Sequence, residues 1–132
     1  MKMKKCLILV CLLSLVMLTV HSQTKQGTPS QIIIYQGDVA GTGPGLNSLK
    51  LAVGEEATVT AKGIDENGND VSIWPTWKCD SELSIKVVEG KSKTAIVKAL
   101  KESAVTTFFT AVYITDEGKK VTADGMVQIK AK

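Results

Sequence analysis

The sequence contains no arginine, and its only histidine, His21, lies in an N-terminal segment that export would remove. A protein without imidazole lacks the usual general base near neutral pH, the usual activator of serine or cysteine nucleophiles, and the commonest zinc ligand. A protein without arginine lacks the side chain that most often binds phosphates and base edges. These absences exclude most histidine-dependent catalysis and argue against a nucleic-acid partner.

Residues 1–22 have the three-part pattern of a secretory signal peptide. Three lysines among the first five residues form a basic start, residues 6–20 form an apolar run, and Val20-His21-Ser22 ends it with a small residue. A membrane anchor is the alternative, but about 15 apolar residues fall short of the roughly 20 that span a bilayer. We therefore predict cleavage near Ser22, an exported protein that is secreted, periplasmic or cell-surface associated, and no membrane anchor in the mature form.

Charge and cysteine content both change with this cleavage. It removes three of the 16 lysines and none of the 13 carboxylates, which leaves a formally neutral chain without the basic excess that nucleic acid attracts. Two of the three cysteines leave as well, so Cys79 has no partner for an intrachain disulfide. A buried thiol is the commoner role for such a cysteine, and an intermolecular disulfide is the alternative. We predict a free thiol and a monomer.

About 110 residues remain after cleavage, which is the size of one domain. Residues 23–31 are polar and are predicted to form a flexible tether, and residues 32–132 to form the folded domain. Seven to eight short alternating segments, separated by turn signals about every 8 to 12 residues, predict an all-β sandwich, with a barrel as the alternative. The predicted strands are residues 32–35, 48–53, 57–63, a segment opened by Trp74 and Trp77, 83–89, 94–100, 106–115 and 121–130.

Four short motifs occur in order within residues 53–80: Val-Gly-Glu, Thr-Val-Thr-Ala, Asp-x-x-Gly and Trp-x-x-Asp. This order resembles the bacterial Ig-like domains of group 2, the invasin- and intimin-related kind. The resemblance covers residues 49–130 and implies an Ig-like two-sheet Greek-key β-sandwich that serves as an adhesion or binding module at the bacterial cell surface. The family commonly has serine at the position of Cys79, so the resemblance assigns this cysteine no family function.

Two loops have compositions that suggest ligand sites, but neither has its residues at the spacing that the corresponding binding motif requires. Residues 37–45 contain four glycines but lack the Gly-Lys-Ser/Thr of a phosphate-binding loop, and they are predicted to be a flexible crossing. Residues 65–70 resemble a calcium loop, but glycine is fourth rather than sixth and Thr76 stands where a bidentate glutamate is needed. The Asn67-Gly68 pair instead favours a tight turn. We predict no metal and no cofactor.

The two tryptophans have different predicted roles. Trp77 lies on the strand whose tryptophan fills the space between the sheets of an Ig sandwich, and it is predicted to be core. Trp74 precedes Pro75, which favours an extended backbone, and it lies near the start of the strand. Burial is the more frequent outcome for an aromatic residue. Exposure would make Trp74 a binding residue.

The segment 106–115 is apolar on both faces. If Phe109, Ala111 and Tyr113 face the core, the opposite face of the strand carries Phe108, Val112 and Ile114. The explanations are a different register, cover from a neighbouring strand or the N-terminal segment, or an exposed contact surface. We therefore name as candidate binding residues Trp74, Phe108, Val112 and Ile114, and name no catalytic residue.

The functional prediction is a non-catalytic exported module for adhesion, carbohydrate or protein binding, or envelope assembly. Its partner would be a surface protein or a carbohydrate. The alternative is a small extracytoplasmic hydrolase, or a hydrolase inhibitor, that uses surface carboxylates. Glycoside hydrolysis would require two converging carboxyl groups about 5 to 10 Å apart.

Overall fold

The computed structural model describes residues 27–132, which form nine β-strands in two packed sheets and include no helix. The predicted all-β sandwich is confirmed. Among the described residues there is no helix that could cross a membrane. The predicted signal peptide and residues 23–26 of the predicted tether lie outside the described residues. The strands are β1 (Gln31–Gln36), β2 (Ser48–Ala52), β3 (Glu56–Ile64), β4 (Asp70–Val71), β5 (Thr76–Cys79), β6 (Leu83–Val88), β7 (Lys91–Ala99), β8 (Thr107–Ile114) and β9 (Lys120–Lys130).

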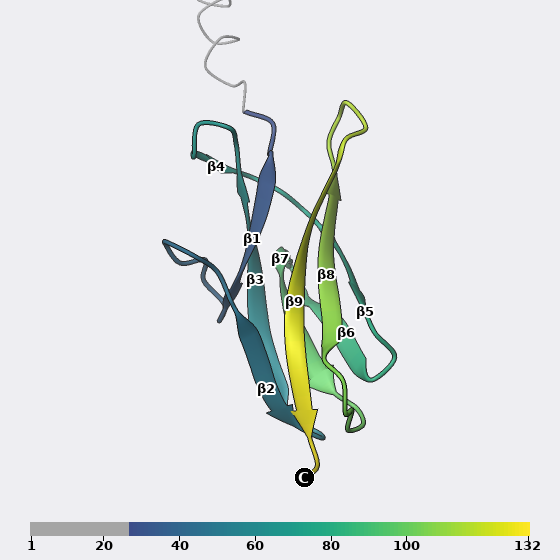
Figure 1. The fold of residues 1–132 in the computed structure, drawn as a ribbon. Coiled ribbons are helices and arrows are strands. Elements are labelled where there is room, and N and C mark those ends of the chain that lie inside the picture. The colour runs from purple at the N-terminus through teal and green to yellow at the C-terminus, as the bar shows by residue number, and fades with distance from the viewer. Residues whose placement is uncertain (1–26) are drawn as a thin grey trace, which may run out of the picture.

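Sheet A has the strand order β1-β3-β7-β6, with β4 paired to the end of β3, and sheet B has the order β2-β9-β8-β5. Neighbouring strands are antiparallel except β2 and β9, which run parallel. Because β1 and β2 are consecutive but lie in different sheets, residues 37–47 cross from one sheet to the other. Figure 1 shows the two sheets facing each other, with the β8–β9 hairpin and the β3–β4 turn at the same end.

The predicted strands are present, with ends that shift by at most three residues. The additional strand, β4, has only two residues, which is too short for a period of two to be recognised. Trp74 lies before β5 rather than within it. The final predicted tether residue, Gln31, already belongs to β1, and Pro29 before it is buried.

Alternation along the strands places about every second side chain between the sheets, where Phe109, Val59 and Val97 are fully buried. Trp77 is 9% exposed and belongs to this core, as predicted. Its indole N–H donates to the backbone carbonyl of Ser92 at 3.1 Å. The polar end of the tryptophan is therefore satisfied while its ring packs against Phe109, with a centroid distance of 6.3 Å.

One core position requires glycine for space. Gly125 lies opposite Phe109 in the β8–β9 ladder, and a Cβ atom added there would overlap the phenyl ring. A glycine inside a strand often marks such a close approach. The alternation of residues 121–129 is therefore kept, and its central glycine leaves room for the largest fully buried side chain.

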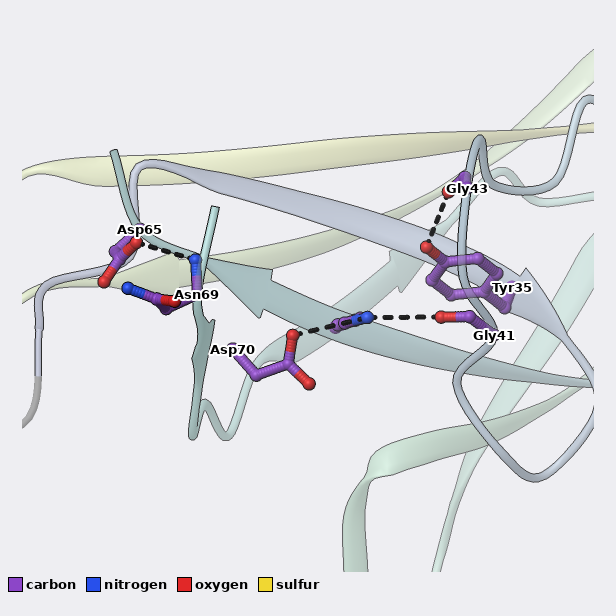
Figure 2. Close-up of polar contacts among 7 residues, drawn as sticks. Tyr35, Gly41, Gly43, Asp65, Asn69 and Asp70 are labelled. Atoms are coloured by element: carbon purple, nitrogen blue, oxygen red, sulfur yellow. Dashed lines mark hydrogen bonds and ion pairs between the residues drawn. The ribbon is translucent and has the colours of Figure 1, made fainter. Parts of the chain in front are cut away.

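Outside the core, residues 37–47 cover the part of the outer face of sheet A that β1 and β3 form. Tyr35 points away from the core cluster but is only 7% exposed, because this loop folds back over its ring. The Tyr35 hydroxyl donates to the carbonyl of Gly43 at 2.8 Å, as Figure 2 shows, and a Cβ atom on Gly41 would lie 3.3 Å from the ring. The predicted crossing therefore also shields the Tyr35 ring from solvent, and its glycines allow the loop backbone to lie close to that ring.

Candidate functional site

A surface hollow lies at the end of the sandwich where the β8–β9 hairpin and the N-terminal end of the described chain come together. Figure 1 shows this hairpin and this chain end at the same end of the two sheets. The hollow has a volume of about 400 Å³. We call it the Trp74 pocket, and its lining comprises Gly27, Thr28, Pro29, Val71, Ser72, Trp74, Tyr113, Thr115, Asp116 and Glu117. Three separate segments therefore contribute to one concave site, which sequence order alone does not reveal.

Alternation continues through the link between β4 and β5 and directs Trp74 outward. Ile73 is 2% exposed and Pro75 is buried, whereas Trp74 between them is 64% exposed. Burial, the more frequent outcome for an aromatic residue, is therefore wrong for Trp74. Its ring contacts Tyr113 edge to face, with centroids 5.6 Å apart and planes at 86°. Tyr113 is 9% exposed and supports the tryptophan from the core side.

The β8–β9 hairpin places two carboxylates on the pocket wall. Thr115 is buried, and its backbone N–H donates to the carbonyl of Lys119 while its hydroxyl accepts the Lys119 N–H at 3.0 Å. Gly118 has a φ of +86°, as the predicted turn requires. The turn is therefore closed by backbone and threonine, and Asp116 and Glu117 line the pocket.

A second hollow of about 340 Å³ lies beside the first and shares Gly27, Thr28, Pro29 and Glu117 with it. It is lined by Gly27, Thr28, Pro29, Ser30, Asp65, Glu66, Asn67, Glu117 and Lys119, and we call it the acidic pocket. Segment 27–30 is fixed between the two pockets, because the Ser30 N–H donates to the carbonyl of Ile64 at 2.8 Å. Among residues 27–132, four carboxylates and one lysine line the two pockets together, so the described surface at this end of the molecule is acidic.

The acidic turn between β3 and β4 is organised by its own backbone. One oxygen of Asp65 accepts the N–H groups of Asn67 and Asn69, both at 2.9 Å, and Gly68 has a φ of +83°. Figure 2 shows the contact between Asp65 and Asn69. No group of three or more potential metal-ligating side chains occurs among residues 27–132. This carboxylate acts as the acceptor of an Asx turn.

The predicted apolar residues of β8 divide into exposed and buried positions. Phe108 and Ile114 are 42% and 63% exposed, whereas Val112 is only 9% exposed. Val112 lies between Thr76 of β5 and Thr122 of β9 in the ladder. Val112 lies on the same face of the sheet as Phe108 and Ile114, but it exposes little area to a partner.

Met126 is a surface residue that the sequence reasoning did not name. It pairs with Phe108 across the β8–β9 ladder and is 37% exposed. The period of residues 121–129 already places it outward, but only the pairing register shows that it extends the apolar surface of Phe108. We call the exposed pair Phe108 and Met126, with Ile114 farther along β8, the outer stripe.

The candidate residues thus form two separate sites rather than one. Trp74 contacts Tyr113, the residue before Ile114, so the pocket and one end of the outer stripe are neighbours. Phe108 lies six residues back along β8, roughly 20 Å away at the rise of a strand. The pocket is concave and polar at its edge, whereas the stripe is a flat sheet face.

Cys79 is the free cysteine of the described chain and lies beside the core, where it is half-buried. Its Sγ donates to the carbonyl of Leu83 at 3.4 Å. Burial raises the pKa of the Cys79 thiol, and the neighbouring Asp80 carboxylate raises this pKa further. These surroundings favour the protonated thiol over the reactive thiolate.

No family model matches the sequence, and no curated protein matches it. Among solved structures, one similar chain is a nucleoside hydrolase-related hypothetical protein from Saccharophagus degradans that is associated with carbohydrate metabolism. The two are 14% identical with a TM-score of 0.47, and the match covers 79% of this chain and 26% of that one. The match thus spans about a quarter of the length of that protein, and a likeness of this degree supports no functional inference.

Proposed function

We propose that the protein is an exported, non-catalytic Ig-like binding module that contacts a surface protein or carbohydrate through the sandwich end carrying Trp74. The role is adhesion or envelope assembly at a bacterial cell surface. Export rests on the signal pattern of residues 1–22. The binding role rests on the exposed side chain of Trp74 and the pocket beside it.

Strand order supports the Ig-like assignment. Immunoglobulin-type sandwiches place the first, second, fifth and fourth strands in one sheet and the third, sixth and seventh in the other. Here sheet A has β1-β3-β7-β6 and sheet B has β9-β8-β5, with β2 added beside β9. If β1 and β2 are counted as one strand that changes sheets, and the two-residue β4 is set aside, the two orders agree. The motif resemblance of residues 53–80 independently favours the same family.

The exposure of Trp74 carries the functional proposal. A tryptophan that is 64% exposed, held by Tyr113 beside a concave pocket, is a preformed aromatic anchor. Binding energy concentrates in such aromatic anchors, whereas exposed carboxylates contribute mainly to steering. The outer stripe is a secondary contact surface, since Phe108 and Met126 add adjoining exposed apolar area.

The test is a pull-down from envelope extracts together with a glycan array, using the full chain purified after export. Trp74→Ala should abolish or strongly weaken capture of the partner, and Phe108→Ser should weaken it less. Asp65→Asn combined with Asp70→Asn should leave binding unchanged. Val39→Ala is a matched control, because Val39 is an exposed apolar residue, at 74%, in the covering loop of sheet A. Partner binding that depends on the two aspartates and not on Trp74 would contradict the proposal.

The hydrolase alternative is tested with the same material. Release of reducing ends from a polysaccharide, lost on Glu117→Gln, would replace binding with catalysis as the role of this end of the molecule.

A further inference from the structure

We propose that the Trp74 pocket binds a neutral saccharide chain, an assignment that rests on the binding function proposed above and specifies its ligand. The aromatic groups, the polar lining and the charge of the pocket each constrain the ligand.

Only one aromatic ring of the pocket is free to contact a ligand. Trp74 is 64% exposed, whereas Tyr113 is 9% exposed and is covered by its edge-to-face contact with the tryptophan. An aromatic cage for an organic cation surrounds the ligand with several ring faces. A single open indole instead offers one flat apolar platform. The apolar C–H face of a pyranose ring matches such a platform in shape and size.

Around this platform the lining is polar and rich in hydrogen-bond acceptors. Asp116 and Glu117 come from the hairpin, and Ser72 and Thr28 add exposed hydroxyl groups. An ionised carboxylate only accepts hydrogen bonds, and its two oxygens can accept from two neighbouring hydroxyl groups of a sugar. A ligand with one apolar face and hydroxyl groups around its edge therefore satisfies both parts of the pocket. An apolar ligand would displace water from these exposed carboxylates without offering hydrogen-bond donors in its place.

Charge disfavours acidic glycans. Asp116 and Glu117 line the Trp74 pocket, and Asp65 and Glu66 extend the negative charge into the acidic pocket, where Lys119 is the single cation among the lining residues of the described part of the chain. Uronic or sulfated sugars would meet like charges, and such contacts disfavour binding. The ligand is therefore a neutral sugar.

The size of the site indicates more than one sugar unit. The Trp74 pocket measures about 400 Å³ and the acidic pocket about 340 Å³, and both are bounded by segment 27–29. Small-molecule sites usually measure about 300 to 1,000 Å³. A chain that stacks one unit on Trp74 and extends toward the Ser30 hydroxyl and the Asn67 amide, which line the acidic pocket, would occupy both hollows.

The experiment titrates the full chain, purified after export, with neutral oligosaccharides of the cello, xylo, manno and malto series. Polygalacturonate and a lysine-rich peptide serve as charged comparison ligands. Calorimetry and tryptophan fluorescence are the readouts, because Trp74 is the exposed tryptophan and Trp77 is buried. At least one neutral series should bind with a change in fluorescence. Trp74→Ala should weaken this binding by about tenfold or more, Trp74→Tyr should retain most of it, and Val39→Ala should not change it.

Each other outcome has a distinct meaning. If no neutral series binds, and the polygalacturonate, the peptide or a protein from the envelope extract binds through Trp74, then the assignment of a neutral saccharide is wrong while the binding function stands. If Trp74→Ala changes no interaction of any kind, both are wrong. Melting temperatures of the variants, measured in parallel, separate loss of binding from loss of folding.

Discussion

The outer faces of the two sheets carry aromatic residues with opposite surroundings. On sheet A, Tyr35 is 7% exposed beneath the loop of residues 37–47, and its hydroxyl is bonded to Gly43. On sheet B, Phe108 is 42% exposed beside Met126. Both aromatics are outward by alternation, so alternation does not distinguish a covered residue from a contact surface. The difference is whether another segment of the chain crosses that face.

Sheet A also shows what a cover requires. Besides Tyr35, Lys62 holds the loop, because its Nζ donates to the carbonyl of Gly41 at 3.2 Å and pairs with Asp70 at 3.3 Å (Figure 2). The Thr60 hydroxyl donates to the carbonyl of Gly37 at 2.7 Å. Several side chains of sheet A are thus committed to the loop. Phe108 has no such role for its ring, although its backbone N–H donates to Asp80 at 2.8 Å.

The largest expected loss of stability comes from a substitution in the core between the two sheets. It gives a reference value for the substitutions on the outer faces. Trp77→Ala should reduce the free energy of unfolding by roughly 3 to 5 kcal/mol, the usual cost of deleting a large buried aromatic. The residue is 9% exposed and also holds the Ser92 carbonyl. Urea denaturation followed by circular dichroism measures this change. An unchanged denaturation midpoint would remove Trp77 from the core.

A second prediction compares the two outer faces directly. Tyr35→Ala should cost about 3 kcal/mol because it leaves a cavity under the loop, whereas Phe108→Ala should cost less than about 1 kcal/mol because half-exposed residues contribute little to folding. Tyr35→Phe, which removes only the hydroxyl bonded to Gly43, should cost about 1 kcal/mol. Equal losses for Tyr35→Ala and Phe108→Ala in the same denaturation assay would erase the contrast between the faces.

A third prediction concerns Cys79, which lies at the edge between core and surface. Its raised pKa leaves less thiolate at any pH below that value, so alkylation in the folded protein should be slower than in urea at the same mildly alkaline pH. The rate should increase as pH rises toward the pKa. Mass spectrometry measures this rate, and non-reducing electrophoresis should show a monomer. A dimer that reductant dissociates would indicate that Cys79 is available at the surface.

The smallest expected effect is at the acidic turn. Asp65→Asn retains an oxygen that can accept the N–H groups of Asn67 and Asn69. Asp70→Asn removes the ion pair with Lys62, in which the carboxylate side chain is 74% exposed and the lysine side chain 17% exposed, so water can solvate the carboxylate when the pair is open. Such pairs contribute about 0 to 1 kcal/mol. The double variant should therefore unfold within about 1 kcal/mol of the original chain, and calcium should not change the melting temperature of either. A calcium-dependent rise that the double variant loses would identify the turn as a metal site.

Much of the fold could be predicted from local sequence. Residues 121–129 alternate so regularly that β9 follows from their period alone, and Gly68 and Gly118 have the positive φ angles that their turns require. The core role of Trp77 followed from its strand. The candidate site was only partly predictable: Trp74 and Phe108 are exposed, while Val112 is not.

What the sequence determined by itself is the all-β architecture and most strand and turn positions, because a period of two and the conformational freedom of glycine act over a few neighbouring residues. Only the tertiary structure decided which outward residues are free. Val112 is buried between side chains of β5 and β9, Tyr35 beneath a loop, and Trp74 stands exposed where three distant segments form a pocket. Each outcome depends on contacts between residues far apart in the chain, which no local pattern encodes.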